Sequence, residues 1–228
     1  MESPKFFVVA RVVGRDGALP LWKERLVHLC NVSATERLGD SYYWGQDLDG
    51  EPHTLWGLEG YTHPVGFFIG HVSTDIFKRE MALVDADKLL RTEQGLASPD
   101  YDLHHYDWAG GWLKQADDPE RDSKISLVAV IHFWAASEAT RAELINTLLV
   151  AAKDFNGSAQ SFGILKEVRD ERMVTLWLRS RSPEEYEGLK SSSTFRDLMS
   201  RANEMSTKTE VHRSRAFDGH LDLTSTST

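Results

Sequence analysis

The sequence predicts an α+β protein in which one β-α-β-β-α-β unit occurs twice. The first observation is a repeated tripeptide, Thr54-Leu55-Trp56 and Thr175-Leu176-Trp177, at an offset of 121 residues. The second is that the flanking segments also recur: residues 7–12 match residues 126–131, and Leu103-His104 matches Val211-His212. A supersecondary unit repeated at a nearly constant offset indicates a tandem architecture.

The first copy follows the plan strand, helix, hairpin, helix, strand. Residues 6–13 are an apolar strand-like run, and residues 19–38 place apolar side chains at helical spacing with Pro20 in the first turn. Two strands over 41–46 and 53–60 flank turn residues that include Gly50. A helical region reaches about Leu90, with an irregular start over 65–70, and a strand covers 101–108.

The second copy repeats that plan after the Gly- and Asp-rich stretch 109–123. A strand over 125–134 is followed by a helix to about Phe155, for which Ser137 is the expected N-cap. A hairpin joins 162–168 to 173–180, and one helix over 182–205 precedes a last strand over 209–217.

We therefore expect two ferredoxin-like domains, residues 1–114 and 124–222, with a linker over 115–123 and a disordered tail over 223–228. A sheet with helices on one face leaves its other face uncovered. The two units are expected to pack sheet to sheet and to enclose a space between them.

Composition excludes several classes of partner. The formal net charge of −9 argues against nucleic acid, which binds clustered Lys and Arg. No apolar run approaches the ~20 residues of a membrane span. The first residues resemble no secretory signal, and the single cysteine, Cys30, fits a reducing compartment, so a cytoplasmic location is expected.

Strand alternation predicts which side chains face the enclosed space. The aliphatic residues of 127–133 and 174–178 suit the faces that the helices cover. The inner face then holds aromatic rings and a few polar groups: Arg11, Trp56, His104, Tyr106, Trp108, His132, Trp134, Trp177 and Arg179. This mixture is typical of a pocket for an apolar, partly oxygenated small molecule. The alternative is that Trp56 and Trp177 only fill the core between the sheets.

Metal and phosphate chemistry have no sequence motif here. His104 and His105 are adjacent, so on a strand they point to opposite faces. The spacings of common zinc and iron sites are missing, and so are the Gly-rich phosphate loops and the nucleophile elbow. We expect no metal site.

The chain resembles the antibiotic biosynthesis monooxygenase-like family of the dimeric α+β barrel superfamily. The matching features are Glu36 before the Gly39 turn, Tyr42-Tyr43, the strand 55–61 and the segment 71–77, which begins with His71 and ends with Phe77. The second copy matches more loosely, through Leu176-Trp177 and Ser193-Thr194-Phe195. Single-domain members of the family dimerise to form the barrel, so this chain looks like a fused form; a further homodimer stays open.

The resemblance implies an enclosed pocket in which an aromatic polyketide-like substrate, an anthrone or phenol, is oxidised by O₂ without metal, flavin or haem, as in secondary metabolite biosynthesis. A base forms the substrate anion, and the protein holds that anion away from water. The expected bases are His132 and His104. Arg11 or Arg179 would stabilise the anion, with Tyr106 as a further catalytic group. Trp56, Trp177, Trp134, Trp108 and His71 are expected to contact the substrate.

Two other functions fit the same pocket. A cyclase, isomerase or dehydratase would use the same stabilised anion without O₂. A non-catalytic protein would bind the small molecule only, because a fold does not determine a function.

Overall fold

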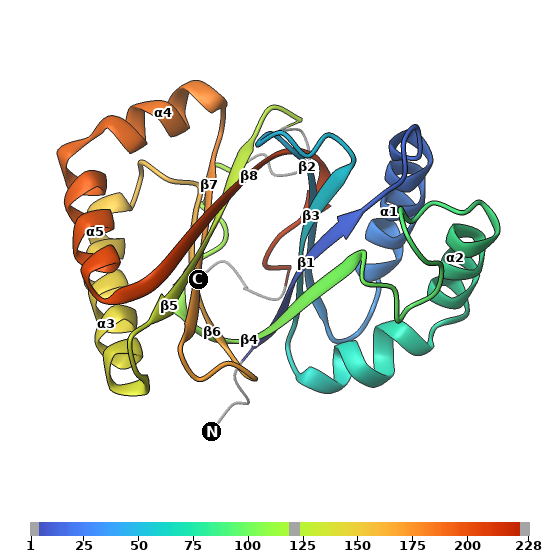
Figure 1. The fold of residues 1–228 in the computed structure, drawn as a ribbon, viewed down its shortest axis with the longest axis horizontal. Coiled ribbons are helices and arrows are strands. Elements are labelled where there is room, and N and C mark those ends of the chain that lie inside the picture. Colours follow the sequence, from blue (N-terminus) through green and yellow to red (C-terminus); the bar gives the residue numbers. More distant parts are fainter. Residues whose placement is uncertain (1–4, 119–123, 224–228) are drawn as a thin grey trace.

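The eight strands of the chain form one closed antiparallel barrel, flanked by helices on two opposite sides (Figure 1). The computed structural model describes residues 5–118 and 124–223. The strand order around the barrel is β1-β3-β2-β8-β5-β7-β6-β4. Each repeat supplies four neighbouring strands, and the pairs β2–β8 and β4–β6 join the two repeats. The predicted fold class, two ferredoxin-like units closed into a barrel, is confirmed.

The first repeat contains β1 (Phe6–Val13), α1 (Leu19–Ser33), β2 (Gly39–Asp47), β3 (Thr54–Tyr61), α2 (Asp75–Ala86) and β4 (Tyr101–Trp112). Two short helical turns, η1 (Gly66–Gly70) and η2 (His71–Ser73), precede α2 where the sequence predicted an irregular segment. The strand β4 runs four residues beyond the predicted end at Trp108, because these residues pair with β6 of the second repeat.

The second repeat contains β5 (Leu127–Ala135), α3 (Glu138–Phe155), β6 (Ser161–Glu167), β7 (Met173–Ser180), α4 (Pro183–Ser191), α5 (Ser193–Glu204) and β8 (Ser206–His220). The expected N-cap Ser137 accepts a hydrogen bond from the Thr140 N–H. The single helix predicted over 182–205 is wrong. Ser192 ends α4 with an extended backbone, and its hydroxyl accepts from the Phe195 N–H to begin α5.

The division into domains 1–114 and 124–222 remains a prediction, since the strand pairs β2–β8 and β4–β6 join the two repeats in one barrel. Residues 119–123 of the predicted linker and residues 224–228 of the predicted tail lie outside the described residues.

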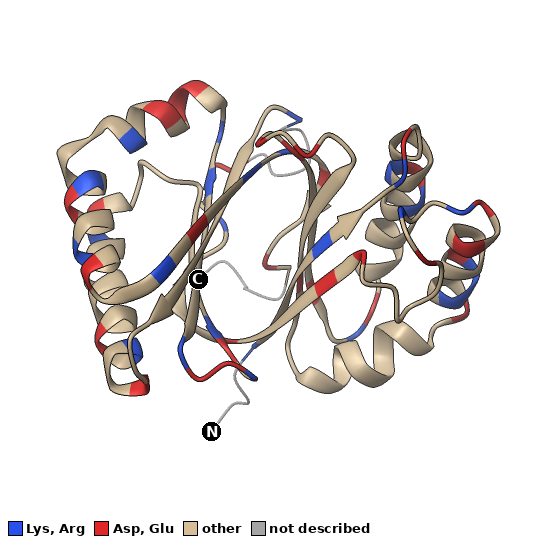
Figure 2. Cartoon of the chain, viewed as in Figure 1, with Lys and Arg blue, Asp and Glu red and all other residues tan. Residues whose placement is uncertain are grey.

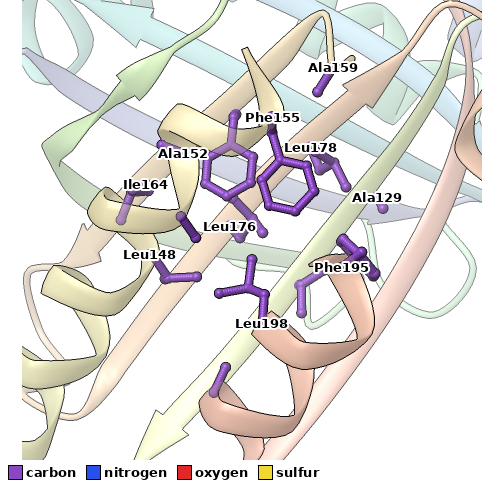
Figure 3. Close-up of a cluster of buried hydrophobic side chains, with 14 of the residues drawn as sticks. Ala129, Leu148, Ala152, Phe155, Ala159, Ile164, Leu176, Leu178, Phe195 and Leu198 are labelled. Carbon is purple, nitrogen blue, oxygen red and sulfur yellow. The ribbon is translucent and has the colours of Figure 1, made fainter. Parts of the chain in front are cut away.

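Apolar side chains form three layers. One cluster lies inside the barrel, one lies between the strands and helices of the second repeat, and two lie on the helix side of the first repeat. Figure 3 shows the cluster of the second repeat, where Phe155, Phe195 and Leu198 from the helices meet Ile164, Leu176 and Leu178 from the strands. None of the helices that the structure describes is long and apolar enough to cross a membrane.

Candidate functional site

The strands direct their side chains as alternation predicts. Trp56, Tyr106 and Trp177 belong to the cluster inside the barrel, with Trp108 and Trp134 packed against it. His104 and His132 line a cavity that opens at one end of the barrel. His105, the neighbour of His104 on β4, lies on the other side against Phe67 and Phe68.

Most of the barrel interior is filled with side chains. Tyr106 and Trp177 are buried, and the Trp177 ring meets Tyr43 edge to face with 5.7 Å between centroids. The Trp108 ring packs on the Phe7 ring, with 5.3 Å between centroids. Trp108 and Trp177 therefore act as core residues here, and their contact with a substrate remains a prediction without support from a cavity.

A cavity of about 480 Å³ remains at one end of the barrel; we call it the barrel-mouth cavity. It brings together five of the predicted site residues: Arg11, Trp56, His104, His132 and Trp134. The remaining lining residues are charged or polar, including His212 and Lys208 of β8. Figure 2 shows the charged positions on β1, β4 and β8 that surround this end. Most of the lining is charged or polar, so the cavity suits a wholly apolar substrate poorly.

His132 is the most deeply buried of the barrel-mouth histidines. Its Nδ1 lies 2.8 Å from the Thr175 hydroxyl, which donates to the Tyr106 hydroxyl at 2.8 Å. Because the Thr175 proton is used in that bond, His132 Nδ1 donates to Thr175 and Nε2 carries the lone pair. Burial, helped by the neighbouring His104, His212 and Lys208, holds the pKa of His132 well below its usual value.

Arg179 lies apart from these residues. Its side chain is buried, and its guanidinium forms an ion pair with both carboxylate oxygens of Asp118. Its Nε donates to the Ser161 hydroxyl at 3.1 Å. The structure therefore gives Arg179 a structural partner, and its predicted role in substrate binding has no supporting contact.

A second cavity, of about 210 Å³, lies on the opposite face of the first repeat's sheet; we call it the helix-side cavity. Its walls are the outward-facing residues of the strands, the helices α1 and α2, the turns η1 and η2, and Leu96. Its lining is apolar and includes six aromatic residues: Trp22, Tyr42, Trp44, Phe67, Phe77 and Tyr101. Glu59 of β3 is the one acidic or basic side chain among the described lining residues.

The carboxylate of Glu59 is held by tyrosines. The Tyr61 hydroxyl donates to Glu59 Oε2 at 2.9 Å, and Tyr42 is within hydrogen-bond reach of the same carboxylate. Burial raises the pKa of Glu59 despite these hydrogen bonds. Burial, with the charge of Glu59, raises the pKa of Tyr42 and Tyr61 well above their usual value, so both tyrosines stay protonated donors.

His71 completes this polar cluster. The side chain is buried beside Tyr42, Tyr61 and Phe77, and its Nδ1 lies 2.9 Å from Glu36 Oε1. Burial by itself lowers the pKa of His71, but the Glu36 hydrogen bond and the charges of Glu59 and Glu36 outweigh it and raise that pKa. The buried Nε2 of His71 has no hydrogen-bond partner within the described part of the chain. His71 is thus apart from the other predicted site residues, and it packs behind Tyr42 and Phe77, which line the helix-side cavity.

The two repeats differ at Gly57 of β3. A Cβ on Gly57 would lie 2.6 Å from the Trp44 ring, so the missing side chain lets the indole lie against the sheet. Through the strand registers, Leu178 takes the place of Gly57 and Phe162 that of Trp44 in the second repeat. Both are buried in the helix-facing core of that repeat.

The sequence analysis did not select Glu59, Tyr42 or Tyr61 as site residues. The available signal was their direction, because alternation from Trp56 and Leu58 places Glu59 and Tyr61 on the face that helices cover. A carboxylate on such a face is rare unless it has a partner or a function.

No protein-family model matches the sequence, and no curated protein matches it. Three solved structures share the fold over nearly their whole length. A "putative monooxygenase" from Fusobacterium nucleatum subsp. nucleatum has a TM-score of 0.78 and 13% identity, covering 97% of this chain and 96% of that one. An "anthrone oxidase-like protein" has a TM-score of 0.64 and 10% identity, covering 96% and 94%. A "major regulator of staphylococcal pathogenesis" has a TM-score of 0.54 and 10% identity, covering 94% and 99%.

These likenesses agree with the fold that the resemblance implied, a fused α+β barrel. At such low identity they show the fold alone.

Proposed function

We propose that the protein is a cofactor-independent monooxygenase that oxidises a small aromatic metabolite, an anthrone or phenol, in the helix-side cavity. The observation that carries this proposal is a buried carboxylate, Glu59, in a cavity whose remaining lining is apolar and aromatic. The names of two structures with the same fold, a putative monooxygenase and an anthrone oxidase-like protein, support it as an analogy.

Glu59 is the proposed general base. A carboxylate with a raised pKa removes a proton more readily at neutral pH than an ordinary carboxylate does. The acidic proton of an anthrone is on the methylene carbon between its aryl rings. The flat rings would lie against Trp44 and Phe67, with this carbon toward Glu59.

His71 is the proposed partner of the substrate anion. Its raised pKa favours the protonated ring, and Nε2 is a buried donor that lacks a protein acceptor among the described residues. A substrate oxygen that becomes negative on deprotonation would provide that acceptor. Glu36 holds the ring through Nδ1 and fixes which nitrogen faces away from it.

The oxidation then balances with O₂ as the only oxidant. The substrate carbanion gives O₂ two electrons and forms a carbon–oxygen bond, and the resulting peroxide takes up a proton. Loss of water breaks the oxygen–oxygen bond: one oxygen stays on the carbon as a ketone, and the other leaves with the two hydrogens of the former methylene. The apolar lining of the cavity limits the contact of bulk water with the anion.

The size of the cavity limits the substrate. Its 210 Å³ is below the ~300–1,000 Å³ of typical ligand pockets, so a compact aromatic molecule fits better than an extended polyketide chain.

The test measures O₂ consumption with 1,8-dihydroxyanthrone as probe, after subtraction of the spontaneous rate. Glu59→Gln should lower kcat by about 10²–10⁴-fold, the usual contribution of a general base. Glu143→Gln, at an exposed position on α3, is the matched control and should keep wild-type turnover.

Other outcomes identify the rival functions. Equal turnover of a substrate without O₂ would favour the cyclase, isomerase or dehydratase. Binding without turnover would favour the binding protein. Full activity in Glu59→Gln together with loss in His132→Ala would move the reaction to the barrel-mouth cavity, on the inner face where the sequence analysis placed the catalytic residues.

A further inference from the structure

The barrel-mouth cavity is separate from the proposed oxidation site. The two cavities lie on opposite faces of the same strands: Leu103 lines the helix-side cavity, and the next residue, His104, lines the barrel-mouth cavity. Residues of both repeats form the barrel-mouth cavity, since Arg11 and Trp56 come from the first and His132 and His212 from the second. The proposed oxidation uses none of these side chains.

The carboxylates around this cavity already have partners. Asp47 accepts hydrogen bonds from Trp56 Nε1 at 3.0 Å and from two backbone N–H groups. Asp49 pairs with Arg213 at 2.6 Å, and Glu210 pairs with Lys208 at 2.7 Å.

Two further carboxylates have longer contacts. Glu51 Oε2 lies 3.8 Å from Arg91 Nη1, and Asp102 Oδ1 lies 3.5 Å from His104 Nε2. Asp49 and Glu210 therefore have a cationic partner at hydrogen-bond distance, and Asp47 is held by neutral donors.

The guanidinium of Arg11 is different. It makes no hydrogen bond or ion pair with any residue that the structure describes, although it is only partly exposed and lines the cavity. Asp102, the register neighbour of Arg11 on β4, contacts His104 instead. Keeping an unpaired charge away from water is costly. A carboxylate is the acceptor that fits a guanidinium best, because its two oxygens match two parallel N–H donors.

Aromatic faces flank this cation. Trp56, the register neighbour of Arg11 on β3, stacks on His212 with 4.4 Å between ring centroids. Trp134 lies on the other wall, and Lys208 covers its ring at 4.4 Å. A flat apolar group beside the carboxylate would pack between such rings. The surrounding carboxylates oppose a doubly charged anion more strongly than a singly charged one.

His132 offers a second polar contact. The side chain is 4% exposed, and its Nε2 has no partner among the described residues. The charged or titratable groups that surround the ring are His104 of β4, Lys208, Glu210 and His212 of β8, and Arg11 of β1. Protonation of Nε2 would supply another donor to a bound anion, so binding of an anion is expected to draw a proton onto this histidine cluster.

We propose that the barrel-mouth cavity is a second binding site, for a monocarboxylate with a flat apolar body, in which Arg11 pairs with the carboxylate and Trp56 contacts the apolar body. The site requires both repeats, because the cation comes from β1 and the histidine from β5.

The experiment measures binding of 2-naphthoate to the full chain by calorimetry, with 2-naphthamide and 2-naphthyl phosphate as neutral and doubly charged analogues. The carboxylate should bind at least about tenfold more tightly than either analogue. The amide lacks the charge that pairs with Arg11, and the doubly charged phosphate is repelled more strongly by the surrounding carboxylates. The side-chain NMR signals of His132 and His212 should shift on binding, which locates the ligand in the barrel-mouth cavity rather than beside Glu59. Titrations in two buffers with different ionisation enthalpies should show proton uptake.

Arg11→Met should weaken 2-naphthoate binding about tenfold or more and leave 2-naphthamide binding nearly unchanged. Arg15→Met is the control, because Arg15 is exposed and donates to backbone carbonyls outside the cavity. Circular dichroism checks that each variant is folded. Equal affinity of folded Arg11→Met and wild type, preference for the neutral amide, or unshifted His132 and His212 signals would each overturn the proposal.

Discussion

The imidazole of His71 is held by Glu36, with Nδ1 2.9 Å from the nearer carboxylate oxygen. The two residues are 35 positions apart in the chain, and the turn that follows α1 brings them together. The pair places a histidine with a raised pKa beside the buried carboxylate of Glu59, whose pKa is raised as well.

Glu36→Gln should lower the pKa of His71. Burial alone lowers that pKa, so losing the charged hydrogen bond lets burial dominate. An NMR titration of the His71 ring measures the change directly. Because the proposed reaction uses the protonated ring, the alkaline limit of kcat should move to lower pH in the same variant. An unchanged His71 titration would show that Glu36 does not control this histidine.

The two buried histidines should affect stability in opposite directions as pH changes. The pKa of His132 is lowered from 6.5, so the folded state resists protonation and stability falls as pH drops below about 6.5. The pKa of His71 is raised above 6.5. Its stabilising contribution to the folded state is therefore fully present below pH 6.5 and is lost as pH rises through the folded-state pKa. Urea unfolding between pH 5 and 8 measures both.

His132→Gln should reduce the loss of stability on the acidic side, and His71→Gln should reduce the loss on the alkaline side. Identical pH profiles in the wild type and both variants would contradict this assignment.

Gly57→Ala should destabilise the protein by roughly 1–3 kcal/mol, because the new methyl group would lie 2.6 Å from the Trp44 ring in a packed site. It should also displace the ring and shrink the helix-side cavity, which raises KM for the anthrone probe. Gly188→Ala is the control. Nothing lies within 4 Å of its added Cβ, and alanine favours the helix by roughly 0.5–1 kcal/mol. Thermal unfolding compares the two variants, and equal effects would show that Trp44 does not depend on Gly57.

Asp118→Ala should cost about 3–5 kcal/mol of unfolding free energy, because it leaves the buried Arg179 guanidinium without its counter-ion. The neighbouring pair Arg181–Asp117 is the control. Its side chains are 44% and 70% exposed, so Asp117→Ala should cost only about 0–1 kcal/mol. Chemical denaturation measures both variants. Equal losses of unfolding free energy in Asp118→Ala and Asp117→Ala would show that burial does not make the Arg179–Asp118 pair more important than the exposed one.

The sequence predicted the fold well because the repeat and the strand alternation are local patterns. The directions of His104, Tyr106 and Trp108 follow from the residues of one strand, and the structure confirms them. The helix over 182–205 was wrong because its break depends on one serine. The Ser192 hydroxyl replaces a helical hydrogen bond with a cap, and a periodicity of apolar residues does not register that change.

The candidate site was harder to predict because cavities depend on contacts between distant segments. Nothing in β7 indicates that Arg179 pairs with Asp118, which is 61 residues away in the predicted linker. The interior that alternation defined is occupied mainly by Tyr106, Trp177 and their neighbours. The helix-side cavity lies on the other face of the sheet, where Gly57 lets the Trp44 indole lie against the strands, and only the packing of strands and helices shows it.

The single chain has a consequence that two identical chains would not have. In a barrel assembled from two copies of one polypeptide, replacing a glycine under an indole would alter both halves at once. Here Gly57 and Leu178 are encoded separately, so one half keeps an open space while its counterpart gains a compact apolar core. The closed barrel then joins the half that has the apolar core to the half that has the helix-side cavity.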